Sequence, residues 1–407
     1  MEHQKTAEQL DISIMYQADE VDHLHRVLEP FNATHRLDRR ARIVGIPWID
    51  TWAALLKIAL HKMGADVSQI GAPLVGDMLS MNVLRPFSAR EVVTLGGEGA
   101  FHPAAWKSAH RKDAESVWAI PWLTDPYLII YWRDMLEQAR VDEQTAFQSF
   151  DQMQETFKRL QASGVATPWA TSTGDRMDTL HTSASWVWGA GGNFVSADGK
   201  HPMFHLPEAQ AGLKAYFSLY RYMPAEGQPL SFRRAREMFA HRQVAARMAD
   251  LPSLLSVARP DAPTDVRARI GVALPPGPPL IGGSNLIIWQ HSHHEQAALE
   301  LVRYLVSPPA QKEYCQSLGY FPVRLDVLNQ PPYSTDPHLQ GYVRAIQHGR
   351  PFPTVRMAGM LEDRLATALG QISVAVIANP DSDLDALISN QVEPLARRLE
   401  LTLNAPD

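Results

Sequence analysis

The chain has 407 residues, of which 45% are hydrophobic and 20% are charged, and its formal net charge is −6. This length is too great for a single hydrophobic core, so two domains are expected, and the negative charge argues against nucleic acid or an anionic membrane as the main partner. Cys315 is the lone cysteine, which excludes an intrachain disulfide, and no apolar run in the sequence reaches transmembrane length.

The first seventy residues alternate between short apolar runs and amphipathic segments. They predict strands and helices in strict alternation, beginning with a strand, over residues 12–16, 24–31, 42–46, 52–63 and 67–70. Asp50 or Thr51 can cap the second helix, and Gly64 can end it. A β-α-β-α-β start predicts a parallel sheet with helices on its faces.

Ligands of such sheets bind at the carboxyl ends of the strands. In this chain those ends carry Gln17, Asp19, Trp48 and the turn at residues 71–73. These residues are therefore candidates for ligand contact.

Residues 117–135 form two apolar runs separated by a polar stretch at 124–126. The pattern predicts strand, break, strand, because β-formers dominate both runs and proline does not fit inside a central ladder. The break is either a bend within one sheet or a crossing between two lobes, with Trp122 and Asp125 at the cleft. An aromatic face beside a carboxylate suits a polyhydroxylated ring, whose C–H patches stack on indole while its hydroxyls donate to the carboxylate.

Capping residues and prolines mark the later elements. Ser149 with Gln152 and Ser292 with Glu295 both have capping-box spacing, and Pro207 can open a helix. The later helices are expected over 150–160, 207–220, 292–306, 358–378 and 383–403, and the later extended segments over 244–248, 270–274 and 318–324.

Motifs of nucleotide binding and catalysis are missing from the sequence. The glycines at 96–99 lack dinucleotide spacing, Gly199-Lys200 is not followed by Ser or Thr, and no Gly-x-Ser-x-Gly elbow occurs. Residues 293–295 begin like a zinc-protease motif, but alanines occupy the places of a second ligand. With no recognisable acid/base pair, neither an enzyme, a cofactor nor a metal site is expected, although the histidines near 293 could bind a metal adventitiously.

Five segments in order resemble one known family. They are residues 64–71 with 82–87, 119–125 with 131–134, 188–193 with 198–200, 239–248 and 319–324. Taken together, they resemble the extracellular solute-binding proteins of ATP-driven (ABC-type) sugar importers, the relatives of maltose-binding protein. The resemblance covers nearly the whole chain.

This resemblance implies an α/β fold of the periplasmic-binding-protein type II, a two-lobed clamshell. Each lobe would be a mixed, mostly parallel sheet flanked by helices, and hinge crossings would join the lobes. Residues 1–120 with 275–320 are expected in lobe one, and residues 121–274 with 321–407 in lobe two. The resemblance also implies a monomeric, non-enzymatic protein that closes on a mono- or oligosaccharide between its lobes and delivers it to membrane permease subunits.

Ligand-binding residues are expected in both lobes. The patterns and the resemblance together indicate Gln17, Asp19, Trp48, Trp122, Asp125, His181, Ser185, Trp186, Asp250, Ser284, Asn285 and Arg356. Asp125 would hold sugar hydroxyls beside Trp122, and His181, Ser185 and Trp186 would lie on a helix of the second lobe.

Two departures from the family pattern leave the ligand open. Ala72-Pro73 replaces an aromatic residue after the third strand, and residues 250–253 lack the usual Gly and Trp. The ligand is therefore either a sugar or one of three further classes, namely a polyol, a glycerophosphodiester or a small peptide. A signalling sensor of the same fold and a sugar-active cleft enzyme are rival functions.

The residues after Met1 lack an apolar export region. A periplasmic or extracellular location, with or without a lipid anchor, is expected if a leader was removed. A cytoplasmic location is expected if Met1 is the true start.

Overall fold

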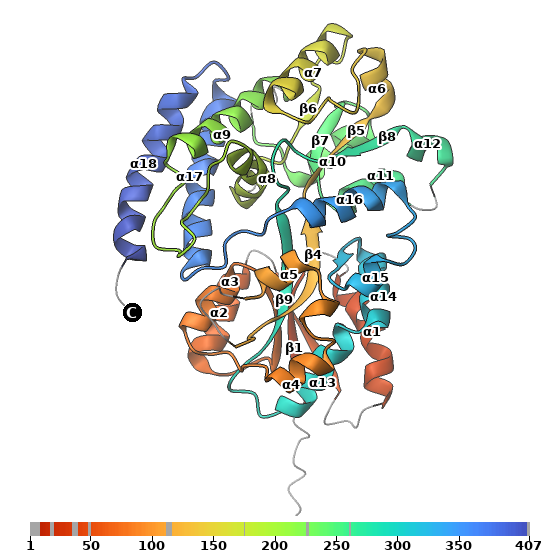
Figure 1. Ribbon diagram of the computed structural model, residues 1–407, viewed down its shortest axis with the longest axis vertical. Helices are drawn as coiled ribbons and strands as arrows, with labels where there is room; N and C mark the ends of the chain where they lie inside the picture. Colours follow the sequence, from red (N-terminus) through yellow and green to blue (C-terminus); the bar gives the residue numbers. More distant parts are fainter. Residues whose placement is uncertain are drawn as a thin grey trace, which may run out of the picture. The chain divides into compact units, whose positions relative to one another are not determined.

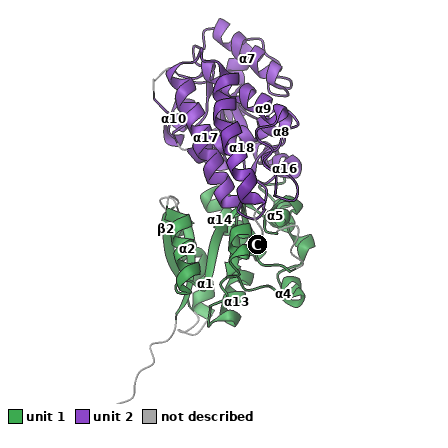
Figure 2. Ribbon diagram, turned by 90° about the vertical axis from the view of Figure 1, so that its left-hand side faces the viewer, with its two compact units in different colours: residues 1–125, 282–334 green, residues 126–281, 335–407 purple. Residues whose placement is uncertain are grey.

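A computed structural model describes residues 9–16, 20–34, 40–47, 50–110, 116–174, 176–224, 228–259 and 262–404 (Figure 1). Unit 1 comprises residues 1–125 and 282–334, and unit 2 comprises residues 126–281 and 335–407 (Figure 2). The expected lobe boundaries all fall earlier in the chain than these. Among the described helices, none is both long and apolar enough to cross a membrane.

Unit 1 is built on a six-stranded sheet in the order β10-β4-β9-β3-β1-β2. Its strands are β1 (Leu10–Tyr16), β2 (Ala41–Pro47), β3 (Val67–Gly71), β4 (Ile120–Pro126), β9 (Ile281–Ile288) and β10 (Phe321–Pro322). β1 runs parallel to β2 and β3, as the alternating start of the sequence predicts, whereas β9 runs antiparallel to β3. The sheet is therefore mixed.

Helices cover both faces of this sheet (Figure 1). They are α1 (Glu20–Thr34), α2 (Thr51–His61), α3 (Leu74–Ser80), α4 (Ala89–Thr94), α5 (Pro103–Ser108), α13 (Glu295–Leu305), α14 (Pro308–Leu318) and α15 (Leu325–Leu328), with a 3₁₀ turn at Glu98–Ala100. Apolar side chains of α1, α13 and α14 build a first core, and those of α2 and α3 build a second one. Alternate residues of the strands supply each core, because successive strand side chains point to opposite faces.

Unit 2 contains a four-stranded sheet in the order β6-β7-β5-β8. Its strands are β5 (Leu128–Trp132), β6 (Trp169–Ala170), β7 (Ala246–Ala249) and β8 (Ile270–Ala273). β6 runs parallel to β7, but β7 and β8 both run antiparallel to β5. β6, β7 and β8 therefore run in one direction and β5 runs against them, so this four-stranded sheet is mixed and mostly parallel, as expected.

The helices of unit 2 come from two distant parts of the chain. They are α6 (Arg133–Gln138), α7 (Phe150–Ala162), α8 (Arg176–Gly189), α9 (Pro207–Ser218), α10 (Phe232–Ala240), α11 (Leu251–Ala258), α12 (Thr264–Ala268), α16 (Pro337–His348), α17 (Ala358–Ala378) and α18 (Leu384–Leu403), with a 3₁₀ turn at Leu219–Tyr222. α17 packs against α8 and α18, so the C-terminal segment completes a layer begun by residues 176–218.

Local capping explains where several helices start. The Ser149 hydroxyl accepts a hydrogen bond from Gln152 N at 3.2 Å and so caps α7, as its spacing predicts. The predicted box at Ser292 is wrong, because the N-cap residue of α13 is His294. Ser292 instead donates to the buried carboxylate of Asp66 at 2.6 Å.

The predicted break falls at Tyr127 rather than at residues 124–126, since β4 continues through Pro126 and β5 begins at Leu128. The two strands belong to different sheets, so the chain passes from unit 1 to unit 2 here, which is the second of the two explanations expected for the break. Pro121 is the second residue of β4 and so lies near the start of the strand, where proline is tolerated.

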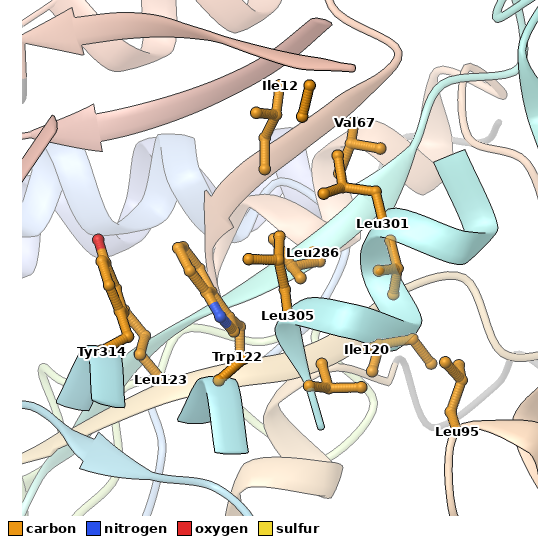
Figure 3. Close-up of a cluster of buried hydrophobic side chains, with 14 of the residues drawn as sticks. Ile12, Val67, Leu95, Ile120, Trp122, Leu123, Leu286, Leu301, Leu305 and Tyr314 are labelled. Carbon is orange, nitrogen blue, oxygen red and sulfur yellow. The ribbon is translucent and has the colours of Figure 1, made fainter. Parts of the chain in front are cut away.

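Trp122 lies in the first core of unit 1 rather than at a ligand surface. Its side chain has 0% exposure and stacks on Tyr314, with ring centroids 5.0 Å apart and an interplanar angle of 13°. Figure 3 shows the two rings side by side among aliphatic residues that include Leu286 and Leu305. The prediction that the Trp122 indole stacks on a ligand is therefore wrong, because core side chains already cover the ring.

Replacing Trp122 with alanine should lower the free energy of unfolding by about 3–5 kcal/mol, the usual cost of deleting a buried aromatic side chain. Urea denaturation measures this loss. Ligand affinity of the molecules that remain folded should not change. A variant with wild-type stability would contradict the core role of Trp122.

Candidate functional site

Three of the expected ligand-binding residues, Gln17, Asp19 and Trp48, lie outside the described residues. The other nine lie in unit 1 or unit 2.

In unit 1, one edge of the sheet gathers polar groups from distant parts of the chain. β3 ends at Gly71, which pairs with Ser284 near the start of β9. β4 reaches the same edge, because the Thr124 hydroxyl donates to the carbonyl of Gly282 at 3.3 Å. This edge therefore combines the carboxyl end of a parallel strand, where ligands of such sheets bind, with the two strands by which the chain leaves and re-enters the unit.

A buried amide organises this edge. The side chain of Gln69 donates to Ser284 Oγ at 2.9 Å and accepts from Met15 N at 3.1 Å. Gln69 and Ser284 are each 5% exposed. Ser284, an expected ligand residue, is thus held by β3, and Gln69 links the ends of three strands.

Asn285 is the unusual residue at this edge. It is 1% exposed, and neither its amide oxygen nor its amide nitrogen has a hydrogen-bond partner. The preceding residue, Gly283, has a φ of +141°, and a Cβ on it would lie 2.3 Å from the carbonyl oxygen of Leu123 in β4. Only glycine lets β9 come this close to β4. A buried polar group without a partner costs about 1–3 kcal/mol, so the position of Asn285 needs a reason.

Asp125 occupies the last position of unit 1 before the chain enters unit 2. Its side chain is half-buried at the end of β4. It follows Thr124, which is tied to Gly282. The carboxylate is therefore attached to the same edge as Ser284 and Asn285.

In unit 2, the corresponding edge lies where the parallel strands β6 and β7 end. Residues 171–174 follow β6, and Asp250 follows β7. β5 begins at the same edge, since Leu128 pairs with Ala249. The chain therefore enters the sheet of unit 2 at this edge, a few residues after Asp125.

Helix α8 carries three of the expected residues near this edge. His181 Nε2 lies 2.8 Å from Glu362 Oε1 of α17, and its ring meets the edge of Tyr127 at 6.4 Å. Ser185 is one turn further on the same face; it is 0% exposed and its hydroxyl has no partner. His181 and Ser185 thus lie together, with one paired and the other unpaired.

Trp186 points elsewhere. It is 0% exposed and meets Tyr216 of α9 edge-on, with ring centroids 5.3 Å apart. A residue next to Ser185 on a helix is rotated by about 100° from it, which turns the indole into the helical layer. The prediction that Trp186 contacts the ligand is therefore wrong.

Asp250 and Arg356 have local surroundings of different kinds. Asp250 is the N-cap of α11 and accepts from Ser253 N at 3.0 Å, so one carboxylate oxygen already serves the helix. Its backbone carbonyl accepts from the Tyr342 hydroxyl at 2.9 Å. Arg356 is half-buried in the segment before α17.

Arg247, in the middle of β7, was not among the expected residues. It is 0% exposed, and its two terminal guanidinium nitrogens have no hydrogen-bond partner, while Nε donates to Met248 O at 2.9 Å. Burial lowers its pKa to about 10, against the opposing charge of Asp250, so the group is still protonated at neutral pH. The guanidinium lies over the ring of Phe232 at 5.0 Å.

Each edge by itself offers both hydrogen-bond donors and acceptors. In unit 1, Asn285 supplies an amide and Asp125 a carboxylate. In unit 2, Ser185 supplies a hydroxyl and Arg247 supplies guanidinium donors. Several buried indole N–H groups also lack partners, but each is one donor on a mainly apolar ring, whereas Asn285 and Arg247 leave two polar atoms apiece. Within the described ranges, no group of three His, Cys, Asp or Glu side chains could hold a metal ion.

The sequence does contain signals for the two missed residues. Gln69 stands beside Ser68 between Val67 and Ile70 in a short strand, and Arg247 stands between Ala246 and Met248 in another. A large polar side chain in a strand buried on both faces needs either an internal partner or a ligand. Gln69 has the partner, and Arg247 does not.

Comparison with known proteins identifies relatives across most of the chain. A family model described as bacterial extracellular solute-binding protein matches residues 26–341. A protein named maltotriose-binding protein, from Pyrococcus abyssi, is 23% identical over 366 residues, covering 85% of this chain and 73% of the relative.

Solved structures resemble this chain along nearly its whole length. The sugar-binding protein MalE from Xanthomonas citri has a TM-score of 0.79 at 17% identity, covering 97% of both chains. Maltose-bound MalE3 of T. maritima has a TM-score of 0.78 at 20% identity, covering 97% of this chain and 99% of the other. At these identities the likeness shows the fold, a two-sheet α/β fold shared with these sugar-binding proteins.

Arg247→Met should leave the free protein as stable as the wild type or raise its free energy of unfolding by up to about 4 kcal/mol, because methionine fills similar space without a buried charge. Urea denaturation without ligand measures the change.

Arg267→Met is the matched control. The Arg267 guanidinium is mostly buried and bonds Asp336 and the carbonyl of Ala258, so its removal should lower stability. If Arg247→Met destabilises the protein as much as Arg267→Met does, the Arg247 guanidinium has an internal hydrogen-bond partner in the free protein, which contradicts its assignment as an unpaired group.

Proposed function

The chain belongs to the family of bacterial extracellular solute-binding proteins, and on that basis we propose that it captures a carbohydrate and delivers it to the permease of an ATP-driven importer. This family binds solutes rather than transforming them. Carbohydrate is the proposed class because the Pyrococcus relative and both MalE structures are described as binding sugars.

The observation that carries the proposal is the unpaired state of Asn285 and Arg247. Buried polar groups in folded proteins are nearly always hydrogen-bonded, so a group without a partner in the free protein is a candidate for one in the complex. Sugar hydroxyls both donate and accept, which lets one ligand satisfy an amide, a guanidinium and a carboxylate.

The competing ligand classes match these polar groups less well than a sugar does. A polyol offers the same hydroxyls but fewer C–H faces, and a glycerophosphodiester would bring a phosphate to Arg247 next to the negative charge of Asp250. A peptide would need backbone partners along a strand edge. A thermal-shift screen tests all three of these classes beside the sugars.

Transport requires that the ligand favour one arrangement of the two units. A ligand shifts such an equilibrium only by its difference in affinity for the two arrangements. Closing of the units on the ligand, the permease partner and a periplasmic or lipid-anchored location stay predictions here. A sensor of the same fold would bind the same ligand and lack a permease partner.

A thermal-shift screen of maltose, maltotriose, a polyol, a glycerophosphodiester and a small peptide tests the ligand class. Ligand binding raises the melting temperature with the logarithm of ligand concentration over the dissociation constant. We expect the largest rise with one of the sugars. A rise with the peptide or the phosphodiester alone would contradict the proposal.

Asn285→Leu should weaken sugar binding by at least about fivefold, the equivalent of about 1 kcal/mol for lost hydrogen bonds to hydroxyls. In the free protein it should cost no stability, because no internal bond is removed. Calorimetric titration and urea denaturation measure the two effects.

Gln311→Leu provides the matched control in the same unit. Its amide is 0% exposed, but it donates to Trp122 O at 2.7 Å and accepts from Val323 N at 3.0 Å. This variant should lose stability and keep its affinity. An Asn285→Leu protein that binds sugar like the wild type removes Asn285 from the site.

A further inference from the structure

Helix α2 of unit 1 is apolar on two faces but covered on one. Leu55 and Ala59 are buried against the sheet in the second core. Trp52, Leu60 and Met63 are 43%, 64% and 73% exposed. A helix that is hydrophobic on both sides is normally buried between two layers, so the outer face of α2 lacks a covering layer.

Three of the apolar residues form a row along α2. Trp52, half-buried Leu56 and Leu60 follow one another at intervals of four positions, which places them on one side of the helix, and exposed Met63 follows just after the helix ends. We call these four residues the α2 stripe. Val44 of the edge strand β2, 38% exposed, pairs with Ser13 on the same face of the sheet.

Exposed apolar side chains of this size are rare elsewhere in the described residues. Seven are exposed, and four of them belong to the segment 44–63: Val44, Trp52, Leu60 and Met63. Scattered single apolar residues need no explanation, but a cluster marks an interaction surface.

Every charged or titratable side chain of residues 51–64 is basic or a histidine. Lys57, His61 and Lys62 are all exposed. Lys62 caps the helix in the left-handed conformation, with φ of 51°. Asp50, the acid next to the helix in sequence, precedes its first residue and so lies at the opposite end from Lys62. Although the whole chain carries a net charge of −6, the α2 stripe is flanked by positive charge and complements a negative surface.

We propose that the α2 stripe rests on the headgroup layer of a phospholipid bilayer that contains anionic lipid. An interfacial helix presents Trp and Leu to the acyl boundary and Lys to the headgroups, which is the composition of α2. Each lysine near an anionic surface contributes about 1 kcal/mol. The contact is weak and reversible, and it keeps unit 1 beside the membrane in which a permease would lie.

Two other occupants fit less well. A second copy of this chain in a two-fold dimer would bring Lys57 and Lys62 of one molecule against those of the other. A stripe of four side chains, each partly buried already, is also small beside the about 800 Å² per partner of a stable protein interface. The core of a protein partner's interface would be depleted in lysine, whereas here two lysines lie directly beside the stripe.

Co-sedimentation of the intact protein with vesicles tests the proposal. One vesicle preparation is phosphatidylcholine alone, and the other mixes phosphatidylcholine with phosphatidylglycerol. The protein should bind the mixed vesicles, and added salt should weaken that binding. The double variant Leu60→Ser/Met63→Ser should lower the partition constant at least about tenfold, because two apolar side chains no longer leave water. Lys57→Glu/Lys62→Glu should remove the preference for phosphatidylglycerol.

Val93→Ser/Leu401→Ser is the matched control, since these residues are 72% and 80% exposed but lie outside the α2 stripe. This control should bind vesicles like the wild type. All variants should keep wild-type carbohydrate affinity, which separates this proposal from the proposed function.

Three outcomes overturn the proposal. They are a wild-type protein that sediments with neither vesicle, a Leu60→Ser/Met63→Ser variant that still binds, and equal losses in the control. Light scattering that shows dimers abolished by Leu60→Ser/Met63→Ser, without vesicle binding, would assign the α2 stripe to a second copy instead.

Discussion

The close approach of β9 to β4 is the constraint on which the candidate site depends. Gly283 brings the start of β9 so near to Leu123 that no side chain fits between them, and Thr124 bonds the carbonyl of Gly282. Residues separated by 158 positions in the chain thereby become neighbours. Because β4 leads out of unit 1 and β9 leads back into it, one strand pair sets both the exit of the chain and the position of Asp125, Ser284 and Asn285.

Around this strand pair, the polar groups divide into those with partners and those without. Gln69 and Gln311 are buried amides that are fully engaged and therefore stabilise the fold. Asn285 and Arg247 are buried to the same degree and lack partners for two polar atoms each. A folded protein tolerates such groups where function needs them, at a cost in the stability of the free state.

The sequence predicted the alternating start of unit 1, the C-terminal helices and the family, because periodicity and ordered motifs are local signals. It did not predict which tryptophans face outward. Trp122 stands beside a proline and a carboxylate in sequence, yet its partner Tyr314 lies far along the chain and decides its burial. The sense of β5 in unit 2 likewise depends on pairing with distant strands. Gln17, Asp19 and Trp48 stay predictions.

The proposed function implies that one carbohydrate contacts polar groups at the sheet edges of both units. Hydrogen exchange by mass spectrometry, with and without the best sugar from the screen, tests it most directly. The account predicts slower exchange in both units, at residues 123–125 and 283–286 of unit 1 and at residues 171–174 and 249–252 of unit 2. Saturating sugar that protects only one unit, or neither of these edges, would contradict it.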